Sequence, residues 1–169
     1  MSSQPSTIAE LVARFGADGL SIDRLAIVSL GANLPSRFGP PRETVTQAAV
    51  QLSSLTAWPI VLSPIMETEP VDCPPDSPPF CNAVAVLDPG ETIAPAQFLQ
   101  SLQAIETAFG RVRSGRINEA RVLDLDLISF GSHRCQTGAL TLPHPRAAQR
   151  DFVLQPLAVI WPEFRLPDS

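Results

Sequence analysis

The stretch RVRSGRINEARVLDLDLISF, residues 111–130, decides how the rest of the chain is interpreted. Apolar and acidic residues alternate with a period of two over residues 123–128, which predicts a β-strand. Residues i and i+2 of a strand point to the same face, so Asp124 and Asp126 share one face with their Cα atoms about 7 Å apart. The leucines beside them then face the core: Leu123, Leu125 and Leu127.

The chemistry of this stretch is that of a charged-phosphate site. Two adjacent carboxylates repel each other and stay ionised at low cost only beside cations. Mg²⁺ fits such a pair because it takes carboxylate oxygens together with substrate phosphates. Four arginines, whose planar guanidinium groups suit phosphate oxygens, fall within eleven residues ahead of this pair: Arg111, Arg113, Arg116 and Arg121. The pattern predicts phosphoryl or nucleotidyl transfer. The alternative is an acidic pair of purely structural role, neutralised by the neighbouring arginines.

The composition describes one acidic domain with its positive charge gathered in one region. A chain of 169 residues is long enough to bury a real core. The net charge of −5 argues against a general nucleic-acid-binding surface. No lysine is present, so no G-K-[ST] phosphate-binding loop exists. Seven of the twelve arginines lie in residues 111–150 beside only three acidic residues, which predicts a small anionic ligand there.

The cysteines and the apolar runs indicate the compartment. The three cysteines are an odd number and form no C-x-x-C pair, which is typical of reduced thiols in a cytoplasmic protein rather than of disulfides or a zinc site. Every apolar run is far shorter than the 18 or so residues needed to span a membrane. We therefore expect a cytoplasmic protein with no membrane partner.

The order of the predicted elements indicates the fold class. Residues 31–34 are predicted to be a turn, because glycine and asparagine tolerate positive φ. The periodicity predicts helices over 8–15, 42–55, 94–109 and 147–158, strands over 25–30, 59–66, 81–87 and 123–128, and a hairpin through Gly138. The order β-α-β-β-α-β with a final helix predicts an α+β fold, a ferredoxin-like antiparallel sheet with helices packed on it in an α/β/α sandwich.

Two single residues are further candidates for a binding site. Asn82 begins a predicted strand, where its amide can face a pocket; the alternative is that it caps a turn. His144 lies between two prolines that restrain its backbone. An imidazole held near phosphates can donate to an oxygen or transfer a proton, and the alternative is a structural hydrogen bond. The proline-rich residues 71–80 are predicted to be a stiff loop that could cover a substrate.

Seven motifs in order carry a resemblance to a known family. They are GANL (31–34), TEP (68–70), FCNAV (80–84), GRVR (110–113), RVLDLDL (121–127), LPHPR (142–146) and RDFVLQPL (150–157). Over about residues 25–164 the chain resembles the 6-hydroxymethyl-7,8-dihydropterin pyrophosphokinase (HPPK) family of folate biosynthesis. The resemblance implies a pyrophosphokinase domain over residues 24–169, preceded by an extension over residues 1–23 that is partly helical or disordered. It also implies transfer of the β,γ-diphosphate of ATP to the hydroxymethyl group of the pterin.

The resemblance also implies roles for individual residues. Asp124 and Asp126 would bind two Mg²⁺ ions, and catalysis would further involve Arg111, Arg121 and His144. The implied ATP site contains Gln103, Glu106, Arg113, Arg121, Leu127, Thr141, His144 and Arg150. The implied pterin site contains Thr68, Pro70, Val71, Phe80, Asn82 and Phe152. In that site Asn82 would recognise the polar edge of the ring and Phe152 would stack on its face.

One segment departs from the family pattern. The usual loop R-W-G-P-R is replaced by Ile117-Asn118-Glu119-Ala120-Arg121, so the tryptophan that closes over the substrate is absent. Two alternatives follow: a catalytically weakened homologue that binds pterin or nucleotide, and a pyrophosphokinase for a modified pterin. The expected ligands are ATP and hydroxymethyl-dihydropterin, without nucleic acid. We expect a monomer or weak homodimer, with a neighbouring folate enzyme as a candidate partner.

Overall fold

The computed structural model describes residues 3–69, 75, 78–110 and 122–166. Within them a five-stranded antiparallel sheet has the order β2-β4-β1-β5, and β3 also pairs with β4. The strands of this sheet are β1 (Ala26–Ala32), β2 (Val61–Leu62), β3 (Met66–Thr68), β4 (Phe80–Leu87) and β5 (Asp124–Phe130). The predicted hairpin is present as a second sheet of β6 (Cys135–Gln136) and β7 (Thr141–Leu142).

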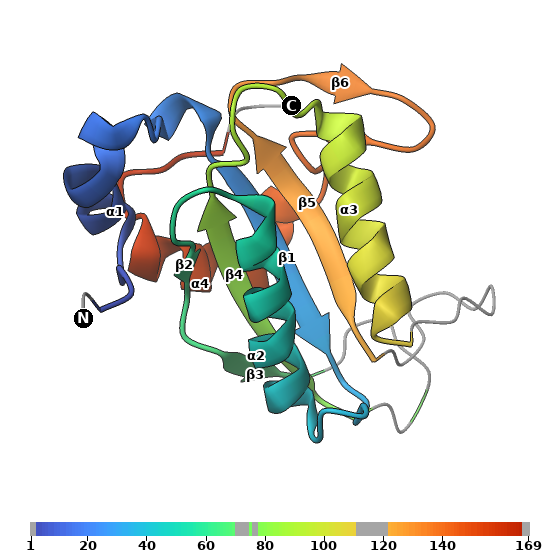
Figure 1. The fold of residues 1–169 in the computed structure, drawn as a ribbon. Helices are drawn as coiled ribbons and strands as arrows, with labels where there is room; N and C mark the ends of the chain where they lie inside the picture. Colours follow the sequence, from blue (N-terminus) through green and yellow to red (C-terminus); the bar gives the residue numbers. More distant parts are fainter. Residues whose placement is uncertain (1–2, 70–74, 76–77, 111–121, 167–169) are drawn as a thin grey trace.

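Helices cover both faces of the sheet. They are α1 (Ile8–Phe15), α2 (Pro41–Leu52), α3 (Pro95–Ala108) and α4 (Asp151–Ile160). Figure 1 shows α2 and α3 across the near face of the strands, with α4 behind them. The order β1-α2-β2/β3-β4-α3-β5 and the antiparallel pairing confirm the predicted α+β class and ferredoxin-like topology.

Alternate side chains of the strands pack into two separate hydrophobic cores, one on each face of the sheet. The first core joins one face of the sheet to α2 and α3, and includes Val28 and Leu30 of β1 with Leu102 of α3. The second joins the other face to α1 and α4, and includes Ile27 of β1 with Leu157 of α4. The period-two pattern of the strands therefore decides which helix layer each side chain meets.

The strand predicted over residues 59–66 is wrong as a continuous element, because it consists of β2 and β3 with a break between them. At the break, the Oγ of Ser63 accepts from the backbone N–H of Val84 (2.9 Å) and donates to the carbonyl of Pro64 (3.0 Å). Pro64 has no N–H to offer the ladder. The strand therefore ends at Leu62 and pairing with β4 resumes at Met66.

A bulge in β5 shifts the alternation of the strand beyond the acidic pair. Val28 pairs with Leu127 and Ile27 pairs with Ser129, so Ile128 is the extra residue on β5. The insertion shifts the alternation by one. Ile128 keeps the parity of Asp124 and Asp126 and lies in the second core. The shift takes effect beyond it and places Phe130 in the first core.

The N-terminal segment packs onto the second core. The predicted helix is confirmed as α1, capped by Thr7, whose Oγ1 accepts from the N–H of Glu10 at 3.1 Å. Its Ile8 and Leu11 are buried. Further along, the buried carboxylate of Asp88 accepts from the Arg24 guanidinium at 2.8 and 3.0 Å and from the Ser21 N–H at 2.9 Å. These contacts tie residues 20–24 to the end of β4.

None of the helices in the described ranges combines the length and the hydropathy that a bilayer crossing requires.

Candidate active site

One row of paired residues runs across three strands at one end of the sheet. Gly31 of β1 pairs with Asp124 of β5 on one side and with Asn82 of β4 on the other. Two interstrand steps separate the Asp124 and Asn82 Cα atoms by about 10 Å. All three positions belong to the face that α4 covers, since Val84 and Ile27 of the same parity lie in the second core. The row places a predicted metal ligand and a predicted pterin contact on one surface.

The second acidic residue lies in the next row on the same face. Asp126 pairs with Ser29 of β1, which in turn pairs with Val84 of β4. Both aspartates are half-buried, and Ser29 between the strands is buried. The predicted sharing of one face by the two carboxylates is therefore confirmed, and so is the core position of the alternating leucines.

Arg150, just before α4, connects the acidic pair with the predicted pterin contacts. Its guanidinium lies 3.6 Å from the carboxylate of Asp126 and stacks at 5.4 Å from the ring centre of Phe152. Arg150 is the residue immediately before α4, which begins at Asp151 and packs on the sheet. Segments more than twenty residues apart in sequence thus meet here.

His144 is held beside the same charges by its own backbone. Its N–H donates to the carbonyl of Ile128 at 2.8 Å, and its Nδ1 accepts from the N–H of Arg146 at 3.2 Å. Because Nδ1 is an acceptor, the neutral ring carries its hydrogen on Nε2. Burial lowers the pKa of His144 below its ordinary value of 6.5; Arg150 and Arg146 lower it further, and Asp124 raises it.

The predicted pterin contacts on the strands form a small polar group beside an aromatic ring. The Nδ2 of Asn82 donates to the Oγ1 of Thr68 at 2.7 Å, across the β3–β4 pair. Phe80 is half-buried on the same face of β4. Asn82 is buried and lies inside the strand, so it does not cap a turn.

The predicted ATP contacts approach β5, an edge strand, from opposite sides. On α3, Gln103 is exposed and Glu106 is buried, and the Oε2 of Glu106 accepts from the N–H of Leu125 at 2.8 Å. Thr141 lies on β7, which packs beside β5. The Leu127 side chain lies in the first core, on the face opposite the two aspartates.

Several predicted site residues lie outside the described part of the chain. These are Arg111, Arg113, Arg121, Pro70 and Val71. Their roles stay predictions, as does the effect of the altered segment 117–121.

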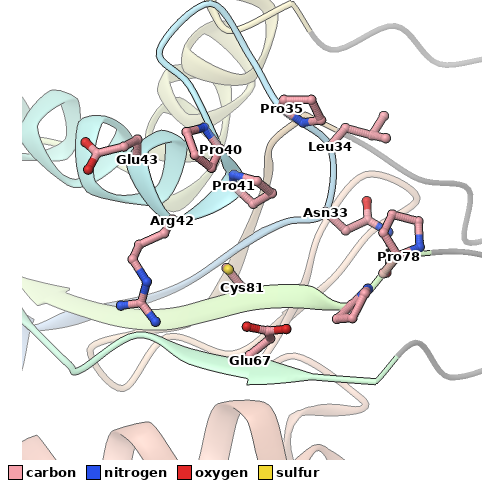
Figure 2. A pocket seen from close by; sticks show the side chains of 11 residues that line it. Asn33, Leu34, Pro35, Pro40, Pro41, Arg42, Glu43, Glu67, Pro78 and Cys81 are labelled. Carbon is pink, nitrogen blue, oxygen red and sulfur yellow. Dashed lines mark hydrogen bonds between the residues drawn. The ribbon is translucent and has the colours of Figure 1, made fainter.

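A cavity lined by described residues lies away from this row. It has a volume of about 570 Å³ and lies on the α2 face, between the loop after β1, the start of α2, and strands β3 and β4 (Figure 2). Cys81 forms the floor of this cavity, and Glu67 and Arg42 lie on either side of Cys81. Burial raises the pKa of the Cys81 thiol. Of the predicted ATP and pterin contacts that the structure describes, none lines the cavity. We place the candidate active site on the other face, where the charged and polar side chains gather.

The acidic pair fits a divalent ion of the hard class. Its donors are carboxylate oxygens on one face, and a cation, the guanidinium of Arg150, already lies against Asp126. Within the described residues, no group of three or more His, Cys, Asp or Glu side chains could hold a metal alone. A metal at this pair would therefore complete its coordination with substrate oxygens and water, as Mg²⁺ commonly does.

Comparison with known proteins shows the family of this chain. The family described as 7,8-dihydro-6-hydroxymethylpterin-pyrophosphokinase (HPPK) matches residues 27–162. The chain belongs to this family. The 2-amino-4-hydroxy-6-hydroxymethyldihydropteridine pyrophosphokinase of Pseudomonas aeruginosa is 41% identical over 84% of this chain and 83% of that protein. The protein of the same name from Haemophilus influenzae is 36% identical over 85% and 86%, respectively.

A solved structure shares the HPPK fold. The crystal structure of Plasmodium falciparum HPPK-DHPS superposes with a TM-score of 0.61 at 13% identity, and the match covers 85% of this chain and 40% of that one. At that identity the likeness supports the fold.

Sequence reasoning missed the place of Gly31 in the site. The stretch 31–34 was predicted to be a turn, which is wrong for its first half, because β1 continues through Gly31 to Ala32. The signal that could have identified it is a glycine at the end of an otherwise apolar strand, which often marks a close approach of another group.

Proposed function

We propose that the chain transfers the diphosphate of ATP to 6-hydroxymethyl-7,8-dihydropterin, forming AMP and the pterin diphosphate in folate biosynthesis. The observation that carries the proposal is the row Asp124–Gly31–Asn82. In this row Asp124, of an acidic pair suited to a metal and phosphates, lies two interstrand steps from Asn82, whose amide suits the pterin edge. Family membership supports the same reaction.

The substrates would enter from two sides of this row. The dihydropterin would lie between the sheet and the start of α4, with its ring against Phe152 and its polar edge at Asn82. Thr68 and Phe80 complete that wall, and Pro70 and Val71 are proposed to close it. ATP would lie along the edge of β5. Gln103 and Glu106 would reach it from α3, and Thr141 and His144 would reach it from the other side. Leu127 would contact it from the strand itself.

In the proposed reaction the pterin hydroxyl attacks the β-phosphorus in line with the leaving AMP oxygen. The new bond joins the hydroxymethyl oxygen to the β-phosphorus, and the bond broken is that between the β-phosphorus and the oxygen retained by AMP. The hydroxyl proton leaves to solvent. Holding the two reactants in this geometry is the main contribution of the surrounding residues.

Mg²⁺, two ions in the proposal, would be held by Asp124 and Asp126 and would acidify the hydroxyl and neutralise phosphate charge. Arg150, which contacts Asp126 at 3.6 Å, is close enough to exchange that carboxylate for a phosphate oxygen. Neutral His144 can donate from Nε2 to a phosphate oxygen. Arg111, Arg113 and Arg121 are proposed to steady the transferring group.

The test is AMP formation from ATP with and without the dihydropterin, for wild type, Asp126→Ala and Asp18→Ala. Asp18 is an exposed aspartate near the N-terminus and serves as the matched control. We expect dihydropterin-dependent AMP from wild type and Asp18→Ala, and a loss on the order of 10³-fold for Asp126→Ala. Full activity in Asp126→Ala would contradict the metal assignment.

The same assay separates the alternatives. Dihydropterin binding by calorimetry without any AMP would identify a binding homologue. AMP formed only with a modified pterin would identify a different acceptor. Removal of Mg²⁺ with a chelator should abolish turnover and re-addition should restore it.

The remaining assignments are a cytoplasmic location, supported by the cysteine pattern, and a monomer or weak homodimer. Sedimentation at several protein concentrations would measure the oligomeric state.

A further inference from the structure

Ser29, in the middle of β1, is a buried polar residue beside the acidic pair. It is only 5% exposed. It lies on the charged face of the sheet, because it pairs with Asp126 of β5 and directly paired residues face the same side. On β4 it pairs with Val84, an apolar residue of the second core. Asp126 is therefore the polar neighbour of Ser29 across the ladder.

The hydroxyl of Ser29 forms no hydrogen bond with any residue in the described ranges. Within those ranges, no side-chain oxygen or nitrogen is both fully enclosed and unpaired. The small exposed part of Ser29 therefore includes its hydroxyl, which is open to solvent on the face of the acidic pair. Most buried polar side chains have a partner, so a hydroxyl without one requires a reason. A neighbouring group that rearranges when a ligand binds supplies such a reason.

Asp126 is the group that can rearrange. Side chains directly opposite each other in an antiparallel pair have Cβ atoms about 4.5–5.5 Å apart, a separation that a hydroxyl and a carboxylate can bridge. In the structure the Arg150 guanidinium lies 3.6 Å from the Asp126 carboxylate. In the proposed reaction Arg150 exchanges this carboxylate for a phosphate oxygen. The carboxylate then needs another group that keeps it in place for the metal.

We propose that Ser29 is a positioning residue for Asp126: its Oγ–H donates to one carboxylate oxygen and leaves the other directed at Mg²⁺. The inference rests on the proposed function and adds a residue that acts through Asp126 without touching metal or substrate. A hydroxyl that donates to an ionised carboxylate forms a short, strong hydrogen bond. Such outer partners orient metal-binding carboxylates, and their loss typically lowers metal affinity about 10- to 100-fold.

The alternative is that position 29 needs only a small side chain on a covered face. Size and hydrogen bonding are separable here, because alanine is small and has no hydroxyl, whereas threonine keeps the hydroxyl and suits a strand. Ser129 is the matched control. It is buried to the same degree, at 4% exposed, and it pairs with Ile27 rather than with an acidic residue.

The experiment measures the affinity for Mn²⁺, a paramagnetic substitute for Mg²⁺, by electron paramagnetic resonance. The titration contains α,β-methylene ATP, in which the bond to be broken is replaced, and is corrected for Mn²⁺ held by this nucleotide alone. The full-length variants are Ser29→Ala, Ser29→Thr and Ser129→Ala, with Asp126→Ala as the reference for a lost ligand. Steady-state kinetics give KM for the dihydropterin, and thermal unfolding verifies that each variant folds.

We expect Ser29→Ala to weaken Mn²⁺ binding by about tenfold or more, with KM for the dihydropterin within about twofold of wild type. Ser29→Thr and Ser129→Ala should bind Mn²⁺ within about threefold of wild type. Wild-type affinity in Ser29→Ala would overturn the proposal. Equal weakening in Ser29→Thr would overturn it too, because the size of the side chain rather than its hydroxyl would then decide the affinity.

Metal binding and turnover separate this inference from the proposed function. If wild type binds Mn²⁺ through Asp126 but forms no AMP, the proposed function fails, while the Mn²⁺ affinities still decide the role of Ser29. If Asp126→Ala binds Mn²⁺ as wild type does, the metal assignment fails and the role of Ser29 fails with it.

Discussion

The two faces of the sheet differ sharply at the end that carries the candidate site, although the same strands build both. On the α4 face, successive alternate positions are Asp124 and Asp126 on β5, and Gly31 and Ser29 on β1. On the α2/α3 face, the neighbours of these residues are Leu125 and Leu30, and both are buried in the first core. Pleating therefore separates the residues that stabilise the domain from those that serve chemistry by a single position in sequence.

It follows that substitutions at residues adjacent in sequence, one on each face, should affect different properties of the protein. A change on the polar face should alter kinetics at little cost in stability. A change on the apolar face should alter stability at little cost in kinetics. Glu106 is the exception, since it reaches β5 from the apolar face and bonds the residue between the two aspartates.

The largest effect is expected from Asp124→Asn. Replacing a candidate metal ligand by a neutral amide should reduce kcat on the order of 10³-fold. The apparent melting temperature should change by less than about 4 °C, because the side chain is half-buried and outside both cores. Turnover and differential scanning calorimetry measure the two quantities. Large destabilisation with normal turnover would break the comparison.

Leu30→Ala should show the opposite behaviour. Leu30 is fully buried in the first core, and its truncation should cost about 2–5 kcal/mol of unfolding free energy. At a temperature where the variant stays folded, both KM values should remain within about twofold of wild type. Denaturant unfolding and low-temperature kinetics provide the measurements. If KM for the dihydropterin rose in step with the loss of stability, the two faces would not be independent.

Glu106 sharpens the comparison because its conservative variant separates two roles. Glu106→Ala leaves the buried N–H of Leu125 without this acceptor, which should cost about 1–3 kcal/mol and lower kcat by loosening the start of β5. Glu106→Gln keeps an oxygen that can accept the same bond, so it should retain most of the activity. Equal loss in both variants, with KM for ATP raised, would show that the charge acts on the nucleotide instead.

The smallest effect concerns pH and His144. The folded pKa lies below the ordinary 6.5, so under mildly acidic conditions the unfolded chain binds more protons at this position than the folded chain. Stability should therefore fall as the pH drops below about 6.5, and His144→Gln should remove that part of the slope. Denaturant unfolding of both proteins from pH 5 to pH 8 measures the difference. Parallel curves over the whole range would contradict a lowered pKa.

Local patterns in the sequence were sufficient for most elements. Alternation over residues 123–128 predicted a strand with acids on one face, and the structure has a strand at Asp124–Phe130 with that division. Helical periodicity predicted α1, α2, α3 and α4 to within a few residues at each end. These predictions succeed because period and composition are set by which face of an element is buried.

The failures have a common physical cause. Pro64 is a local signal for the break between β2 and β3, but the pairing around the break also involves a bond between the Ser63 side chain and the backbone of Val84 on another strand. The continuation of β1 through Gly31 depends on pairing with β4 and β5. Neither contact is visible in the local sequence, because each partner lies more than twenty residues away.

By itself, the sequence determined the fold class, the acidic pair and the family, since these depend on local periodicity and on motifs in order. Only the tertiary structure decided which residues meet. Strand register brings Asp124, Gly31 and Asn82 into one row, and the turn before α4 carries Arg150 to Asp126. The reason is that register is a relation between distant segments, fixed by the burial of both sheet faces at once.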